Sequence, residues 1–128
     1  MVKVTVKFKA DNQAIKRLEQ AQRRALVLTV EALKTDIISS QVVPKDTGEL
    51  ERSAFIDESQ LEKLVVSLIY DTPYARRLYW HPEYNFRTDK NPNAQGKWLE
   101  IYITGDKKDF IKDTYMFFLK REAKGLIK

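Results

Sequence analysis

Apolar and polar residues alternate at the start of the chain, where Val2, Val4, Val6 and Phe8 are separated by lysine or threonine. A period of two is typical of a β-strand with one buried face. Residues 2–8 are therefore predicted to form a strand. The lysines on its other face suit an edge position, because exposed lysine discourages pairing with further chains.

A helical pattern replaces the alternation from Asn12 to Ser40, with apolar residues at spacings of three and four. Asp11 or Asn12 can cap the helix, and no glycine or proline interrupts the sequence before Pro44. At about 1.5 Å per residue, such a helix is about 40 Å long. One of its faces is predicted to lie on the core, and the mixed charges on the other faces to meet solvent.

A turn is predicted at residues 44–50, PKDTGEL, with Pro44, Asp46, Thr47 and Gly48 as its structural residues. Proline stops the helix, and Asp and Thr side chains bond to nearby backbone amides. Gly48 allows the positive φ that other residues resist. A short helical turn over residues 49–52 is a further expectation.

Residues 53–58 and 64–70 are two strand-like runs joined by a polar segment, which indicates a β-hairpin with a longer loop. The second run has apolar residues on both faces, so it is predicted to be a central strand. Pro73 then opens a short helix over residues 73–80, in which Tyr74 and Leu78 face inward and Trp80 is a further candidate to do so.

Residues 98–103 alternate too briefly to distinguish a strand from a helical turn, and both remain open. A last helix is predicted over residues 107–124, capped by Thr104 or Asp106. Together these elements predict a single α+β domain over residues 1–128. A small antiparallel sheet of three to four strands packs against the long N-terminal helix and the C-terminal helix.

The segment from Tyr70 to Trp98 contains both tryptophans, four of the six tyrosines and the sole histidine. Its second half, residues 81–97, has neither helical nor strand periodicity. Loops of this length in small domains are usually binding loops, lids or disordered segments, and disordered segments are poor in aromatic residues. A long projecting loop that docks on a partner is therefore the main expectation, and a loop packed on its own aromatics is the alternative.

The composition excludes several kinds of functional site. The chain has no cysteine, which excludes disulfides and thiolate chemistry, and it has no apolar run long enough for a membrane helix. His81 could join Glu83 or Asp89 at a metal ion, but metal sites need more ligands than this segment supplies, so no metal, cofactor or catalytic residue is predicted. The start of the chain lacks the continuous apolar segment of a secretory signal, which favours synthesis in a cytoplasm.

The net charge of +5 raises nucleic-acid binding as an alternative function. Basic and aromatic side chains could hold a backbone and stack bases, and the candidates are Arg76, Arg77, Tyr79, Arg87 and Lys90. A third possibility is a small basic ribonuclease of the toxin kind, with Arg76, Arg77, Tyr79 and His81 as its catalytic group. Against both, the basic pairs are scattered over several elements, as on ordinary solvent-facing surfaces.

Two segments resemble a known family. Residues 44–53, PKDTGELERS, resemble the turn of small minor capsid and tail-completion proteins of tailed bacteriophages. Residues 70–103 are similar to minor capsid proteins of phages and prophages of Gram-positive bacteria, in the order PYA, HPEYNF, an asparagine-rich turn and GKW. Ile101 stands where the family pattern has a proline.

The resemblance implies a structural protein of the virion neck, made in the bacterial host cytoplasm, without catalysis. Such proteins join head to tail as homo-oligomeric rings of six or twelve copies around the DNA channel and contact other neck, portal or tail proteins. Aromatic residues and arginine are enriched at interface centres. The candidate interface residues are Tyr74, Arg77, Tyr79, His81, Tyr84, Phe86, Arg87 and Trp98.

Overall fold

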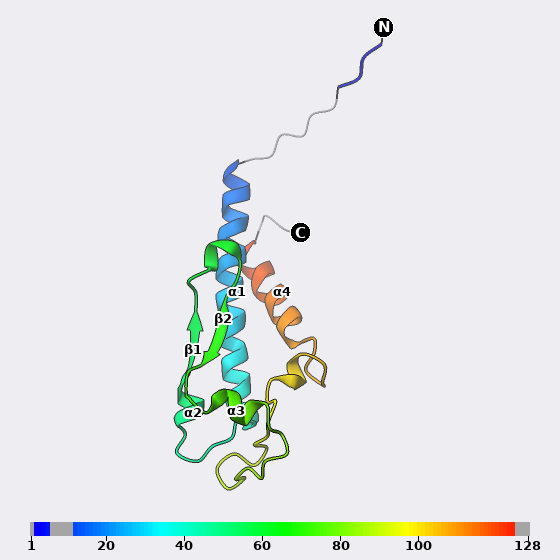
Figure 1. Cartoon of the computed structure of the whole chain (residues 1–128). Coiled ribbons are helices and arrows are strands. Elements are labelled where there is room, and N and C mark those ends of the chain that lie inside the picture. The colour runs from blue at the N-terminus through cyan, green and yellow to red at the C-terminus, as the bar shows by residue number, and fades with distance from the viewer. Residues whose placement is uncertain (1, 6–11, 125–128) are drawn as a thin grey trace.

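The computed structural model describes residues 2–5 and 12–124, and one long helix runs through it (Figure 1). α1 spans Asn12–Ser40, as the sequence predicts. It ends where Gln41 takes a left-handed φ of 55° and Pro44 follows. A hairpin lies along one side of α1, and α4 (Phe110–Glu122) lies along the other. The two short helices α2 (Glu49–Arg52) and α3 (Ala75–Tyr79) lie near the C-terminal end of α1.

The sheet has two strands within the described residues, so the predicted three to four strands are not confirmed. β1 (Ala54–Asp57) pairs antiparallel with β2 (Ser67–Tyr70), and Ala54 lies opposite Tyr70. The hairpin is therefore confirmed, but β2 is not a central strand. Leu68 and Tyr70 on one face of the hairpin pack against the core, whereas Phe55 on the other face is 44% exposed.

The predicted N-terminal strand falls partly on described residues. Residues 2–5 form no strand, and Val2 and Val4 are 95% and 84% exposed. A period-two pattern forms a strand only where a second strand supplies hydrogen bonds, and β1 and β2 do not pair with residues 2–5. Residues 6–8 lie outside the described part.

Two of the remaining helices, α3 and α4, are shorter than their sequence patterns suggest. α2 spans Glu49–Arg52, as expected, and α3 spans Ala75–Tyr79. Residues 98–103, left open by the sequence, contain the 3₁₀ turn η2 (Glu100–Tyr102); a similar turn, η1 (Leu61–Lys63), lies in the hairpin connection. α4 spans Phe110–Glu122, and its N-cap residue is Asp109, which comes later in the sequence than the predicted caps Thr104 and Asp106. The backbone before α4 forms turns, in which the Lys107 amide donates to the Ile101 carbonyl.

The core has two parts along α1. Toward its C-terminal end, Trp98 packs edge-on against Tyr70 and Tyr79, at ring-centroid distances of 5.5 and 4.9 Å. Toward its N-terminal end, Ala21 and Ala25 lie against α4. These small side chains let the two helices approach closely. Across residues 2–5 and 12–124, no helix has the length and apolar character needed to cross a membrane.

Candidate functional site: a groove between the turn and the loop

The turn predicted at residues 44–50 forms a tight corner before α2. Gly48 has a φ of 84°, which is the left-handed region, and its carbonyl accepts a hydrogen bond from the Arg52 amide. The Thr47 hydroxyl accepts a bond from the Glu49 amide at 3.3 Å, and the Arg52 guanidinium donates to the Thr47 carbonyl at 3.1 Å. The turn is thus fixed by its own residues, as its composition suggests.

The second half of the loop, residues 91–97, belongs to the body of the protein. The Asn91 side chain is 3% exposed and donates from Nδ2 to the Val43 carbonyl at 2.8 Å. The Gln95 amide donates to the Val42 carbonyl at 3.0 Å, and the Lys97 amide donates to the Tyr79 carbonyl at 2.8 Å. These bonds tie the loop to the end of α1 and to α3.

Gly96 closes the base of the loop. A side chain at this position would place its Cβ 2.7 Å from the Cα of Pro82 and 3.2 Å from the Leu78 carbonyl oxygen. Backbone can approach backbone this closely only without a Cβ. Residues 82 and 96 therefore meet across the neck of the loop, and residues 83–90 extend beyond this contact.

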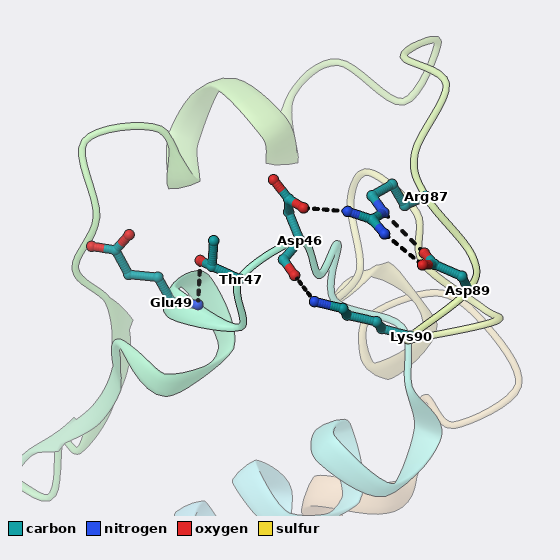
Figure 2. A network of polar contacts seen from close by, with 6 residues as sticks. All are labelled: Asp46, Thr47, Glu49, Arg87, Asp89 and Lys90. Atoms are coloured by element: carbon teal, nitrogen blue, oxygen red, sulfur yellow. Dashed lines mark hydrogen bonds and ion pairs between the residues drawn. The ribbon is translucent and has the colours of Figure 1, made fainter.

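Arg87 joins the exposed part of the loop to the turn (Figure 2). Its guanidinium donates to both Asp89 carboxylate oxygens, at 3.0 and 2.5 Å, and to the Asp46 carboxylate at 2.5 Å. Lys90 donates to the Asp46 backbone carbonyl. Asp89 first, and then Asp46, raises the pKa of Arg87, and Arg87 in turn lowers the pKa of the Asp89 carboxyl. This clasp, formed by Asp46, Arg87, Asp89 and Lys90, sets the distance between turn and loop.

A groove of about 470 Å³ lies between the two segments. Its walls come from the turn, from α3 and from the loop, and they include Leu50, Tyr74, Leu78 and Phe86. The Tyr74 hydroxyl donates to the Glu49 carboxylate at 3.3 Å. Burial, followed by the nearby Glu49 charge, raises the pKa of Tyr74. The groove therefore combines an apolar floor with charged edges, a composition suited to a partner side chain or peptide.

The loop aromatics form a stack on the outer side of α3. The rings of His81 and Tyr84 are parallel within 8° at 4.7 Å, and the Arg77 Nε donates to the Tyr84 hydroxyl at 3.3 Å. His81 Nδ1 lies 2.7 Å from a Glu83 carboxylate oxygen and donates to it, because an ionised carboxylate only accepts. This hydrogen bond lowers the pKa of Glu83.

Six of the eight candidate interface residues come together around this groove and stack: Tyr74, Arg77, His81, Tyr84, Phe86 and Arg87. Trp98 does not, and its assignment to an interface is corrected: it is 2% exposed and lies at the centre of the core. The Tyr79 ring also packs on Trp98. The 3₁₀ turn that follows Trp98 directs the indole inward, and the short sequence pattern there did not reveal this turn.

Trp80 is an exposed aromatic residue near the groove that sequence reasoning did not place among the interface candidates. It is 58% exposed, although the predicted helix made it a candidate for the inner face. α3 ends at Tyr79, so Trp80 leaves the helical phase. The polar residues on both sides of it in sequence, Arg76 and Arg77 before and His81 after, were the available sign that this end of α3 faces solvent.

Three of the residues considered for a ribonuclease, Arg77, Tyr79 and His81, make their side-chain contacts with other residues. Tyr79 is turned into the core, and in the described part of the chain no hydrogen bond or ion pair joins Arg76, Arg77, Tyr79 and His81 to one another. Within the described ranges, His, Asp and Glu side chains do not gather in groups of three or more that could hold a metal ion. Comparisons with family models, with curated proteins and with solved structures found no match for this chain.

Proposed function

We propose that this chain is a structural component of the neck of a tailed-phage virion, a minor capsid or head-tail joining protein without catalytic activity. It assembles as a homo-oligomeric ring of six or twelve copies at the junction of portal and tail. Its partners are further copies of itself and other neck, portal or tail proteins. It is made in the host cytoplasm and ends in the virion.

One observation carries the proposal. The two segments that resemble the phage family, residues 44–53 and 70–103, are separated in sequence, yet they meet at one end of the molecule around the same groove. The clasp between Asp46 and Arg87 holds them together. A fixed body with partly exposed aromatic side chains and exposed arginines at one end is the form expected of a subunit that docks on its neighbours.

The test truncates the loop aromatics without touching the part of the loop that belongs to the body. The double variant Tyr84→Ala, Phe86→Ala removes two rings from the exposed half of the loop and leaves Asn91 and Gly96 in place. Interface energy concentrates in a few aromatic anchors, each worth on the order of 2 kcal/mol. We expect a cooperative melt like that of the unmodified chain, with loss of ring formation in vitro and of complete virions.

Phe117→Ala is the matched control, because Phe117 is 63% exposed on α4, away from the groove. It should melt and assemble normally. Normal assembly of the double variant with a folded body would contradict the role of the loop. Cleavage of RNA by the purified chain, lost on His81→Ala at unchanged stability, would contradict the proposal as a whole.

A further inference from the structure

An exposed basic and aromatic patch lies at the C-terminal end of α3. Trp80 stands on the Tyr79 ring, edge to face at 5.0 Å, and the Lys97 ammonium lies 5.7 Å from the centre of the indole. Arg76 and Arg77 on α3 are exposed beside it. We name Arg76, Arg77, Trp80 and Lys97 the α3 patch. A largely exposed tryptophan flanked by cations is the residue type that most often anchors an interface.

A second exposed apolar surface lies at the other end of the hairpin. The hairpin tip, residues 58–65, places Leu64 against a groove of about 560 Å³ that is also lined by Leu26, Ile103, Ile111 and Tyr115. Leu64, Ile103 and Ile111 are 42%, 64% and 39% exposed, and Val65 beside them is 44% exposed. Large apolar side chains gathered in this way mark an interaction site more often than scattered ones do. We name this hollow the tip groove.

The two surfaces are complementary in charge. The α3 patch is basic, whereas the hairpin tip has the exposed carboxylates Glu58 and Glu62 and follows directly on Asp57. Glu62 pairs with Arg23 at 3.1 Å, and the tip also has the exposed Lys63, so the three carboxylates exceed the two cations by one negative charge. On the α4 side of the groove, two exposed lysines alternate with two exposed aspartates, so that wall has no excess charge: Lys108, Asp109, Lys112 and Asp113. Opposite charges steer association and fix its orientation.

The two surfaces lie at opposite ends of the hairpin (Figure 1). The chain runs from Leu64 along β2 to Tyr70, about 20 Å at about 3.3 Å per residue, before it reaches α3. They therefore cannot meet within one copy. Contact between two copies through different surfaces is head-to-tail, the arrangement that closes into a ring when the rotation permits.

We infer that the α3 patch of one copy docks in the tip groove of the next, with Trp80 inserted beside Leu64 and the basic residues of α3 facing the acidic tip. The inference rests on the proposed homo-oligomer and names the contact that builds it. The occupant of the tip groove is thus a second copy of this chain.

Two variants, each defective in one surface, test the inference. The patch variant is Arg76→Glu, Trp80→Ala, which changes exposed side chains. The tip variant is Glu58→Lys, Leu64→Asn. Leu64 has a φ of 58°, which asparagine tolerates better than leucine, so the substitution should not strain the backbone at this position. Oligomeric state is measured by analytical ultracentrifugation for each variant, for their equimolar mixture and for the unmodified chain, with Phe117→Ala as the control.

We expect the unmodified chain and the control to assemble beyond the dimer. Each variant alone should associate with an affinity at least about 30-fold weaker. The mixture retains one intact patch and one intact groove, so it should form dimers of one copy of each and stop there. Assembly of either variant at the unmodified affinity, or a mixture that stays monomeric, would overturn the inference and leave the proposed ring in place.

A different result would contradict the ring itself. If the unmodified chain stays monomeric at all concentrations, the result contradicts both the proposed homo-oligomer and the proposed contact between the α3 patch and the tip groove. If it also binds single-stranded DNA with a steep salt dependence that the patch variant loses, the α3 patch serves nucleic acid instead.

Discussion

Gly48 shows how a single residue defines the turn on which the candidate site is built. Its φ of 84° lies in the left-handed region, where a residue with a side chain is strained. Its carbonyl accepts the hydrogen bond of the Arg52 amide at the start of α2. A Cβ at Gly48 would lie 2.7 Å from an Arg52 guanidinium nitrogen, the far end of a flexible side chain that can move. Backbone strain, rather than lack of space, therefore sets the cost of substitution.

Gly48→Val should lower the free energy of unfolding by about 1 to 3 kcal/mol, because a β-branched residue is poorly accommodated at positive φ. Gly48→Asn is the control, since asparagine adds a Cβ but tolerates the left-handed region. Denaturant unfolding of the three proteins measures the difference. Equal losses for valine and asparagine would show that the Arg52 contact, and not φ, makes glycine necessary.

The two tryptophans mark the limit of sequence reasoning at this scale. Both lie in the aromatic segment that the sequence singled out, but Trp98 is buried and Trp80 is exposed. Which way each ring points depends on where a short helix stops and where a 3₁₀ turn begins. Such boundaries follow from tertiary hydrogen bonds, like that of the Lys97 amide to the Tyr79 carbonyl, which sequence periodicity does not encode.

Among the elements, the long helix and the hairpin could be predicted, but the number of strands in the sheet could not. A helix satisfies its backbone locally, so the pattern from Asn12 to Ser40 was sufficient to give both ends. A strand needs a partner that may be distant in sequence or absent from the monomer. The alternation in residues 2–8 and the two apolar faces of residues 64–70 therefore led to a larger sheet than the two strands observed.

The loop likewise divides into two parts that composition did not separate. Residues 91–97 are bonded to α1 and α3, whereas residues 83–90 lie beyond the contact of Gly96 with Pro82. Asn91 supplies the buried bond, to the carbonyl of Val43, a residue that is itself fully buried. The asparagine-rich turn thus fastens the loop to the body.

Asn91→Ala should lower the free energy of unfolding by about 1 to 3 kcal/mol, the cost of leaving the buried Val43 carbonyl unpaired. Asn93→Ala is the matched control: its Nδ2 donates to the Ser40 carbonyl at 3.0 Å, but in an exposed position where water can replace it. That variant should change stability by less than about 0.5 kcal/mol. Urea unfolding of both variants checks the comparison, and equal effects would show that the loop is not held by Asn91.

At the scale of the whole molecule, α1 is the connection between two core clusters. Trp98 and its neighbours gather around the C-terminal part of α1, and Ala21 and Ala25 meet α4 nearer its N-terminal end. The chain between the clusters, from η2 to the start of α4, is fastened to α1 by Asp36. The Asp36 carboxylate accepts bonds from the Tyr102 hydroxyl at 2.6 Å and from the Lys107 ammonium at 2.7 Å.

These bonds predict how the stability of the whole molecule depends on pH. Partial burial by itself would raise the pKa of Asp36, but the bonds from Lys107 and Tyr102 outweigh it, and the folded pKa lies below the usual value of 3.8. A depressed carboxylate pKa contributes stability that is present above the unfolded pKa and is lost as the pH falls through the folded one. The contribution of Asp36 should therefore be complete at pH 7 and decrease as the pH falls below the ordinary carboxyl pKa and through the lower folded one.

Asp36→Asn should lower the free energy of unfolding at pH 7 by about 1 to 2 kcal/mol, a figure reduced for the partial exposure of the carboxylate. At pH 2.5 the difference between the variant and the unmodified chain should be smaller than at pH 7, because this pH lies below the ordinary carboxyl pKa of the unfolded chain, where the contribution of a carboxylate with a lowered folded pKa is being lost. Asp113→Asn, an exposed aspartate on α4, controls for the change in net charge and should differ little at either pH. Urea unfolding at the two pH values gives all six free energies. A deficit of Asp36→Asn that persists undiminished at pH 2.5 would mean that shape and packing at this position, and not its charge, hold the start of α4 to α1.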